Sequence, residues 1–301
     1  MKLRRIEKKT RGLFHKLHTE QAADKKVFDR LVALLSPEYL RLPKDFFEGK
    51  VCLDAGCGSN ANATYSMLSH GAQKVHAFDL DKSIFSVAPT MLKKFEGRYE
   101  LKTGSVLNIP YPNESFDFVH CAGVLHHSTD VYTGLSELTR VTKKDGILFI
   151  NVHGKGGIMR DFMGVLREKY HKDKIFRHFI DTLSEKDLLD MWHFIVTSMT
   201  EHGDALGKKI PASLVKELLN RDLVLTIKDR IAAPLYMQST EKELRDWLRT
   251  HGFTKIERVS RYPRLQNIRR FLAPLYNNYE NKYARLFFGE GEPQIKATKK
   301  K

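Results

Sequence analysis

VCLDAGCGSNA, residues 51–61, runs from a short apolar stretch into a glycine-rich turn. The apolar residues predict a buried strand, while Gly56 and Gly58 let the backbone approach a ligand closely. A helix is expected after the turn, and its first N–H groups are free to bind a ligand. A strand, a glycine turn and a helix in this order are typical of a binding loop at the carboxyl edge of an open α/β sheet.

Short apolar runs alternate with helical patterns on both sides of this loop. Further strands are expected at 75–79, 99–103, 116–121, 147–152 and 254–259, and the apolar run at 283–288 is a candidate seventh strand. Helices are expected up to His70-Gly71, over 131–141, and over 84–95 with a break or kink at Pro89. This alternation predicts an α/β fold with a doubly wound, mostly parallel sheet of seven strands.

The alternation stops after Gly154 and resumes near Thr240, where Thr240-Glu-Lys-Glu243 predicts a helix N-terminus with a capping box. We therefore expect four segments: N-terminal helices over 1–47, an α/β core over 48–156, a helical insertion over 157–233, and the end of the core with a basic tail over 234–301. An insertion of this length is tolerated when it leaves from a surface loop.

The formal charge of +15 is concentrated at the two ends of the chain. Residues 1–26 carry nine Lys/Arg and three Asp/Glu, residues 255–301 carry twelve and four, and the remainder is nearly neutral. Basic ends attract phosphate groups or an anionic membrane, and they equally serve as solubilising termini. No apolar run approaches the ~18 residues of a membrane span. Three cysteines form no disulfide framework, so a reducing cytoplasm is the expected location.

Two aspartates end the first two predicted strands. The run at 56–61 also fits the dinucleotide fingerprint GxGxx(G/A), which is a weak signal alone. The charge of Asp54, two residues before Gly56, would repel a pyrophosphate and would suit a cationic ligand. Asp79 follows Gly58 by 21 residues, the spacing at which a carboxylate accepts hydrogen bonds from a ribose. A helix cap or a turn is the competing role for either aspartate.

Four ordered segments together resemble the class I S-adenosylmethionine-dependent methyltransferases, including the group that acts in ubiquinone and menaquinone biosynthesis. They are VCLDAGCGSNA (51–61), VHAFDLD (75–81), NIPYPNESFDFVHCAGVLHH (108–127) and LSELTRVTKKDGILFI (135–150). The resemblance implies S-adenosyl-L-methionine as the cofactor and methyl transfer as the reaction. It does not cover 1–45, 157–233 or 260–301. It also implies that the helical insertion forms a lid over the methyl acceptor.

The resemblance places a cofactor contact at each matched position. It implies that Asp54, Gly56 and Gly58 contact the methionine end of the cofactor and that Asp79 contacts the ribose. It implies adenine contacts for Leu80, Ser105 and Val106. Cys121 and Ala122 would contact the cofactor through their backbone, and His126 would lie at the mouth of the pocket. Asn60 and Ser105 depart from the family pattern, which has Gly and often Asp there.

Methyl transfer from a sulfonium needs alignment and exclusion of water more than it needs acid or base catalysis. A general base is required only for an acceptor that must lose a proton. His126 is the first candidate because imidazole titrates near neutrality, and His127 and His153 are further candidates. A surface position is the competing role. We expect no metal site, because neither a carboxylate nor a cysteine stands at ligand spacing from the histidines.

The expected acceptor is a small or medium-sized metabolite, with no obligate protein partner. A membrane-borne quinone or lipid, and RNA, are alternatives that the basic ends would serve; against RNA, we find no basic and aromatic residues interleaved for base stacking. An NAD(P)-dependent oxidoreductase is a further alternative, opposed by Asp54, and a non-catalytic cofactor-binding subunit is another.

Overall fold

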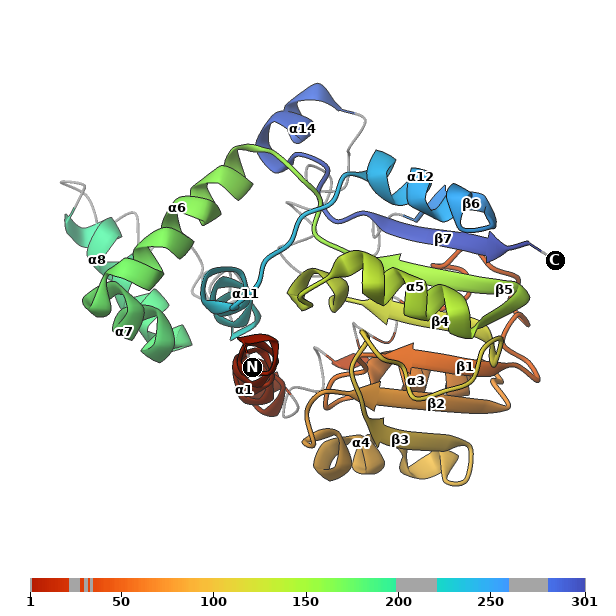
Figure 1. The fold of residues 1–301 in the computed structure, drawn as a ribbon. Coiled ribbons are helices and arrows are strands. Elements are labelled where there is room, and N and C mark those ends of the chain that lie inside the picture. The colour runs from red at the N-terminus through yellow and green to blue at the C-terminus, as the bar shows by residue number, and fades with distance from the viewer. Residues whose placement is uncertain are drawn as a thin grey trace.

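The computed structural model describes residues 2–21, 28–29, 32, 35–198, 221–259 and 281–300. Within them the chain forms one seven-stranded sheet in the order β3-β2-β1-β4-β5-β7-β6 (Figure 1). The strands β1 to β5 are parallel, and β7 runs antiparallel to both of its neighbours. The strands are β1 (Val51–Ala55), β2 (Lys74–Asp79), β3 (Tyr99–Thr103), β4 (Phe116–Ala122), β5 (Thr142–Asn151), β6 (Phe253–Arg258) and β7 (Gln294–Lys299). The predicted α/β class and mostly parallel sheet are confirmed.

Helices cover both faces of the sheet, so each strand alternates its side chains between two cores. On β1, Leu53 packs in one core and Cys52 in the other. The first core includes residues of α5 (Val131–Val141) and α12 (Glu241–Thr250), and the second includes residues of α3 (Asn62–Ser69) and α4 (Ile84–Leu92). Burial on both faces explains why these strands read as continuous apolar runs in the sequence.

The seventh strand lies later in the chain than predicted. Residues 283–288 belong to helix α14 (Lys282–Phe288), and the Asn281 side chain caps this helix by accepting the N–H groups of Tyr283 and Ala284. A short apolar run does not separate helix from strand by periodicity, and we missed this cap. The strand is β7, inside the predicted basic tail.

Lysines of the tail therefore serve the fold. Lys296 Nζ donates to the Arg41 carbonyl oxygen at 2.8 Å, and Lys299 Nζ donates to the Thr142 carbonyl oxygen at 2.7 Å. Ile295 and Ala297 of the same strand are fully buried.

The predicted break at Pro89 is wrong. Helix α4 continues through Pro89 to Leu92, and the chain then tightens into the 3₁₀ turn η1 (Lys93–Phe95). Proline removes only its own N–H from the helix, and here that loss does not end it. Strand β5 also begins at Thr142, before the predicted 147, and residues near 145 form a less regular start of the strand.

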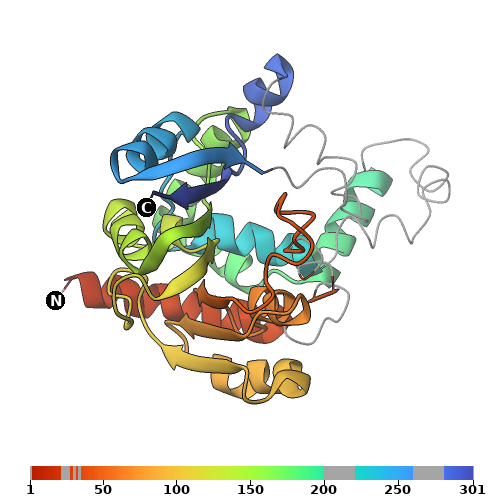
Figure 2. The ribbon, with the colours of Figure 1, turned by 90° about the vertical axis from the view of Figure 1, so that its right-hand side faces the viewer.

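Helices from both ends of the predicted insertion lie beyond the carboxyl ends of the parallel strands (Figure 1). They are α6 (Ile158–Lys172), α7 (Lys174–Thr182), α8 (Glu185–Ser198) and α11 (Arg221–Ala232). Helix α1 (Lys2–Gln21) packs beside α11, as Figures 1 and 2 both show. Residues 35–50 are turns, and Val27, Leu31 and Leu34 of the predicted N-terminal helices lie outside the described residues. Within the described part of the chain, no helix is both long and apolar enough to cross a bilayer.

Candidate active site

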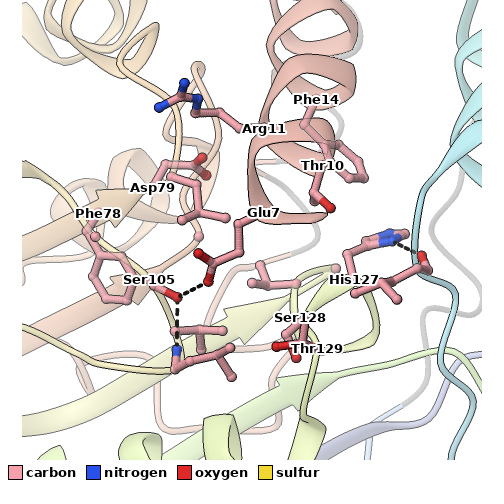
Figure 3. A pocket seen from close by; sticks show the side chains of 18 of the residues that line it. Glu7, Thr10, Arg11, Phe14, Phe78, Asp79, Ser105, His127, Ser128 and Thr129 are labelled. Carbon is pink, nitrogen blue, oxygen red and sulfur yellow. Dashed lines mark hydrogen bonds between the residues drawn. The ribbon is translucent and has the colours of Figure 1, made fainter. Parts of the chain in front are cut away.

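A cavity opens at the carboxyl ends of β1, β2 and β4, with α1 along one side (Figure 3). This is the point at which the strand order reverses, where open α/β sheets bind ligands. Its lining combines loops at the carboxyl ends of the strands with residues 6–14 of α1 and a segment that follows α11. The lining residues are Ile6, Glu7, Thr10, Arg11, Phe14, Gly56, Phe78, Asp79, Leu80, Gly104, Ser105, Val106, Leu107, Ala122, Gly123, Val124, His127, Ser128, Thr129 and Leu235.

The glycine loop forms one wall because side chains are excluded there. Gly56 has a φ of +78°, and a Cβ placed on it would lie 2.2 Å from a methyl carbon of Val124. Its N–H donates to the Phe78 carbonyl oxygen at 2.8 Å, which ties the loop to the end of β2. Gly58 does not line the cavity, but its N–H donates to Asp79 Oδ2 at 3.0 Å.

Asp79 presents a carboxylate at the cavity wall. Oδ2 accepts from Gly58, and Oδ1 accepts from the Asp81 N–H at 3.0 Å. Two backbone donors fix the orientation of the group, and each carboxylate oxygen keeps acceptor capacity for a ligand. Asp79 is therefore held where the sequence predicted a ribose contact.

Asp54 does not lie in the cavity lining, contrary to expectation. Its side chain is 0% exposed and faces α3 and β4. Oδ2 accepts from the N–H and hydroxyl of Thr64 at 3.0 and 2.8 Å, and Oδ1 lies 3.0 Å from His120 Nδ1. A buried carboxylate requires such partners, and the chain itself supplies them. The repulsion argument against a pyrophosphate, which relied on Asp54, therefore loses its basis.

The far end of the cavity is mainly apolar. Leu80 and Val106 line it, and Ser105 adds a hydroxyl that accepts the Leu107 N–H at 3.2 Å. The same hydroxyl lies 3.4 Å from a carboxylate oxygen of Glu7 on α1 (Figure 3). Glu7 was not predicted, because no motif in the sequence links α1 to this loop.

At the end of β4, Ala122 lines the cavity and Cys121 does not. Cys121 is fully buried, and burial raises the pKa of its thiol, so the side chain is a protonated, apolar filler.

Comparison with known proteins identifies the core. Residues 53–150 match a family model described as a methyltransferase domain. Those residues include β1, β2, β4 and the whole glycine loop. Residues 53–150 form a class I S-adenosylmethionine-dependent methyltransferase domain.

Individual relatives match the same region. The chain is 30% identical over 131 residues to demethylmenaquinone methyltransferase of Geobacillus stearothermophilus, covering 40% of this chain and 55% of that protein. It is 31% identical over 106 residues to tRNA U34 carboxymethyltransferase of Campylobacter lari, covering 35% of each. The matches cover less than two thirds of the length of these curated relatives.

A solved structure shares the fold across nearly the whole chain. It is the 1,6-didemethyltoxoflavin-N1-methyltransferase of Burkholderia thailandensis, bound to 1,6-didemethyltoxoflavin and S-adenosylhomocysteine. The TM-score is 0.50 at 16% sequence identity, covering 99% of this chain and 91% of that one.

Three histidines cluster beside the cavity of the methyltransferase domain, although only one lines it. His127 is in the lining, whereas His126 is 3% exposed and lies behind it. The His126 ring packs against that of His153 with a centroid distance of 3.7 Å and an interplanar angle of 31°. The expectation of His126 at the pocket mouth is therefore wrong in detail. Burial lowers the pKa of His126 and His153 well below the ordinary value, so both rings are neutral at pH 7.

The three histidines also lie close enough together to share a metal ion, contrary to the expectation from their spacing in the sequence. One ring nitrogen from each of these three histidines lies within 4.8 Å of the others. His153 follows β5, the sheet neighbour of β4, which precedes the other two. His127 and His153 are 26 residues apart in the sequence, and the pairing of β4 with β5 brings their side chains together.

Proposed function

We propose that this chain is an S-adenosyl-L-methionine-dependent methyltransferase acting on a small or medium-sized metabolite. The observation that carries the proposal is the cavity at the strand-order reversal of a methyltransferase domain, with the Asp79 carboxylate held at its wall. The three free cysteines favour a reducing compartment, so we place the activity in the cytoplasm. No obligate protein partner belongs to the proposal.

The residues present fit the methyl donor. Asp79 keeps acceptor capacity for two ribose hydroxyls, and Leu80 and Val106 offer apolar contact to adenine. Gly56 lets the loop pass close to Val124, with which a Cβ would collide. We assign the methionine end to the loop containing Gly58, through its backbone and not through the Asp54 carboxylate. Cys121 supplies packing behind Ala122, where the bound donor would meet β4.

Bound S-adenosyl-L-methionine supplies a methyl group on a positively charged sulfur, which is already reactive toward a nucleophile. The chain must therefore align the acceptor and keep water out. Helix α1 and Leu235 wall the cavity on the side away from the sheet. The segment holding Leu235 is fixed by backbone bonds, because the Met237 N–H donates to the His126 carbonyl at 2.8 Å and the Ser239 N–H to that of His153 at 3.0 Å.

A metabolite is favoured over RNA as the acceptor because two lysines of the basic tail are engaged within the fold. Lys296 and Lys299 donate to backbone carbonyls and are not arranged for phosphate contact. Helix α1 lies along one side of the cavity and narrows it, which suits a small molecule better than a nucleic-acid strand.

The test is methyl transfer from radiolabelled S-adenosyl-L-methionine into a cell extract, fractionated afterwards into metabolite, lipid, RNA and protein pools. We expect the label in the metabolite pool, with at least a tenfold loss for Asp79→Ala and none for Asp190→Ala on exposed α8. Label that enters only RNA would overturn the assigned acceptor class. Absence of transfer into every pool, together with absence of S-adenosylhomocysteine binding, would overturn the enzyme assignment.

A further inference from the structure

The histidine cluster behind the cavity contains polar atoms that the described chain does not satisfy. His126 Nδ1 and both ring nitrogens of His153 are buried and have no hydrogen-bond partner among the described residues. Each buried polar atom left in this way costs about 1–3 kcal/mol. Such groups are retained where something outside the chain satisfies them, such as water, an ion or a ligand.

His127 adds a second anomaly, because both of its ring nitrogens face acceptor oxygens. Nδ1 lies 3.0 Å from the Leu235 carbonyl oxygen, and Nε2 lies 3.2 Å from Asp229 Oδ1 on α11. The Nδ1–H donates to the Leu235 carbonyl, which leaves Nε2 directed at the carboxylate oxygen. Asp229 Oδ1 itself is buried and makes no hydrogen bond of acceptable geometry.

A shared cation explains both anomalies. Zinc bonds to nitrogen and oxygen are about 2.0–2.1 Å, so ligand atoms at tetrahedral angles stand roughly 3.3 Å apart. The distance of 3.2 Å between His127 Nε2 and Asp229 Oδ1 fits that spacing. The three histidine nitrogens lie within 4.8 Å of one another, so their side chains would have to close in on a bound ion. A metal-binding histidine usually donates its other N–H to a carbonyl, as His127 does to Leu235.

The surrounding charges are mixed. Arg160, Arg167 and Arg230 oppose a cation, while Asp229 and Glu292 favour one. Each guanidinium already has acceptors: Arg160 bonds to the Gly291 carbonyl, Arg167 to that of Ala233, and Arg230 lies 3.5 Å from Glu292.

We propose that His126, His127 and His153, with Asp229 as a fourth ligand, bind a divalent transition-metal ion that prefers imidazole, such as Zn²⁺ or Co²⁺. All four proposed ligands are side chains of this chain, so binding of the metal does not require the proposed methyl transfer. It borders the cavity through His127.

Co²⁺ titrated into the full-length, chelator-treated protein tests this proposal, because bound Co²⁺ in a histidine site gives visible absorption bands that the aqueous ion lacks. The variants are His153→Ala and Asp229→Asn, with His178→Ala on exposed α7 as the matched control. We expect one equivalent to bind to the native protein and to the control. Affinity should fall at least tenfold in His153→Ala, and the bands should shift in Asp229→Asn.

Binding of S-adenosylhomocysteine to the same variants shows that each is folded. Equal Co²⁺ binding by native protein and His153→Ala, or no binding by the native protein, would overturn the proposed site. Neither result bears on cofactor binding, so a failure here is distinct from a failure of the proposed function. If His153→Ala does not fold, His126→Gln, which keeps a polar side chain of similar size, gives the same comparison.

Discussion

At the scale of single residues, two aspartates at neighbouring strand ends have different surroundings. Asp79 lies at the cavity wall with backbone donors on one side, whereas Asp54 is enclosed by Thr64 and His120. Both looked equivalent in the sequence because each ends a strand. The difference arises from α3, whose Thr64 reaches back to Asp54 and consumes its acceptor capacity. Asp54 therefore organises the loop, and Asp79 is available to a ligand.

Substitution of Asp54 should reduce stability more than it alters cofactor contacts. Asp54→Ala leaves the Thr64 N–H, the Thr64 hydroxyl and His120 Nδ1 without their acceptor. At about 1–3 kcal/mol for each buried donor, we expect the free energy of unfolding to fall by about 3 kcal/mol or more. Urea denaturation measures this, with Asp190→Ala as the control. Native stability combined with lost S-adenosylhomocysteine affinity would instead restore Asp54 as a direct ligand contact.

At the scale of elements, α1 was the part of the site that the sequence did not reveal. The glycine loop and Asp79 could be predicted because strand, turn and helix follow one another within 30 residues. Glu7, Arg11 and Phe14 reach the same cavity from the other end of the chain. Such a contact depends on how α1 docks against α11, and no local pattern encodes docking.

Ligand binding should therefore slow hydrogen exchange in α1. The helix closes one side of the cavity, and a bound molecule would add contacts to its residues 6–14. Exchange measured by mass spectrometry, with and without S-adenosylhomocysteine, should show protection in this segment and none in α7. Unchanged exchange in α1 alongside protection of the glycine loop would mean that the helix does not contact the ligand.

Strand β7 is a second element whose position required tertiary information. Residues 283–288 are apolar enough for a strand but form α14, while the lysine-rich segment at 294–299 pairs with both β5 and β6. Only Ile295 and Ala297 identify its buried face. Lys296, Lys299 and Lys300, which lie within or next to this six-residue strand, obscured its alternation of apolar and polar residues.

Burial of Ile295 gives a direct test of this strand. Ile295→Ala should lower the free energy of unfolding by about 2–5 kcal/mol, the usual cost of such a truncation in a core. Ile175→Ala is the matched control, because that side chain is 84% exposed on α7 and its loss should cost little. Chemical denaturation compares the two variants. Equal, small effects would show that β7 does not pack in the sheet.

At the scale of the whole molecule, the fold class and the glycine loop follow from alternation and spacing, while the part of the cavity away from this loop does not. Its walls combine α1, the loop after β4 and the segment after α11. His127 and Asp229 are separated by about a hundred residues yet lie 3.2 Å apart. Two lysines of the predicted basic tail are also held within the fold, because Lys296 and Lys299 donate to backbone carbonyls.

Calorimetric titration of the full-length protein with S-adenosylhomocysteine, and separately with NADH, tests most directly whether the cavity holds the methyl donor. We expect saturable binding of S-adenosylhomocysteine, weaker by one to two orders of magnitude in Asp79→Ala, because a lost hydrogen bond to a charged group costs about 1.5–3 kcal/mol. NADH should not bind. Tight NADH binding without a response to S-adenosylhomocysteine, or equal affinities in folded native and Asp79→Ala proteins, would contradict this assignment.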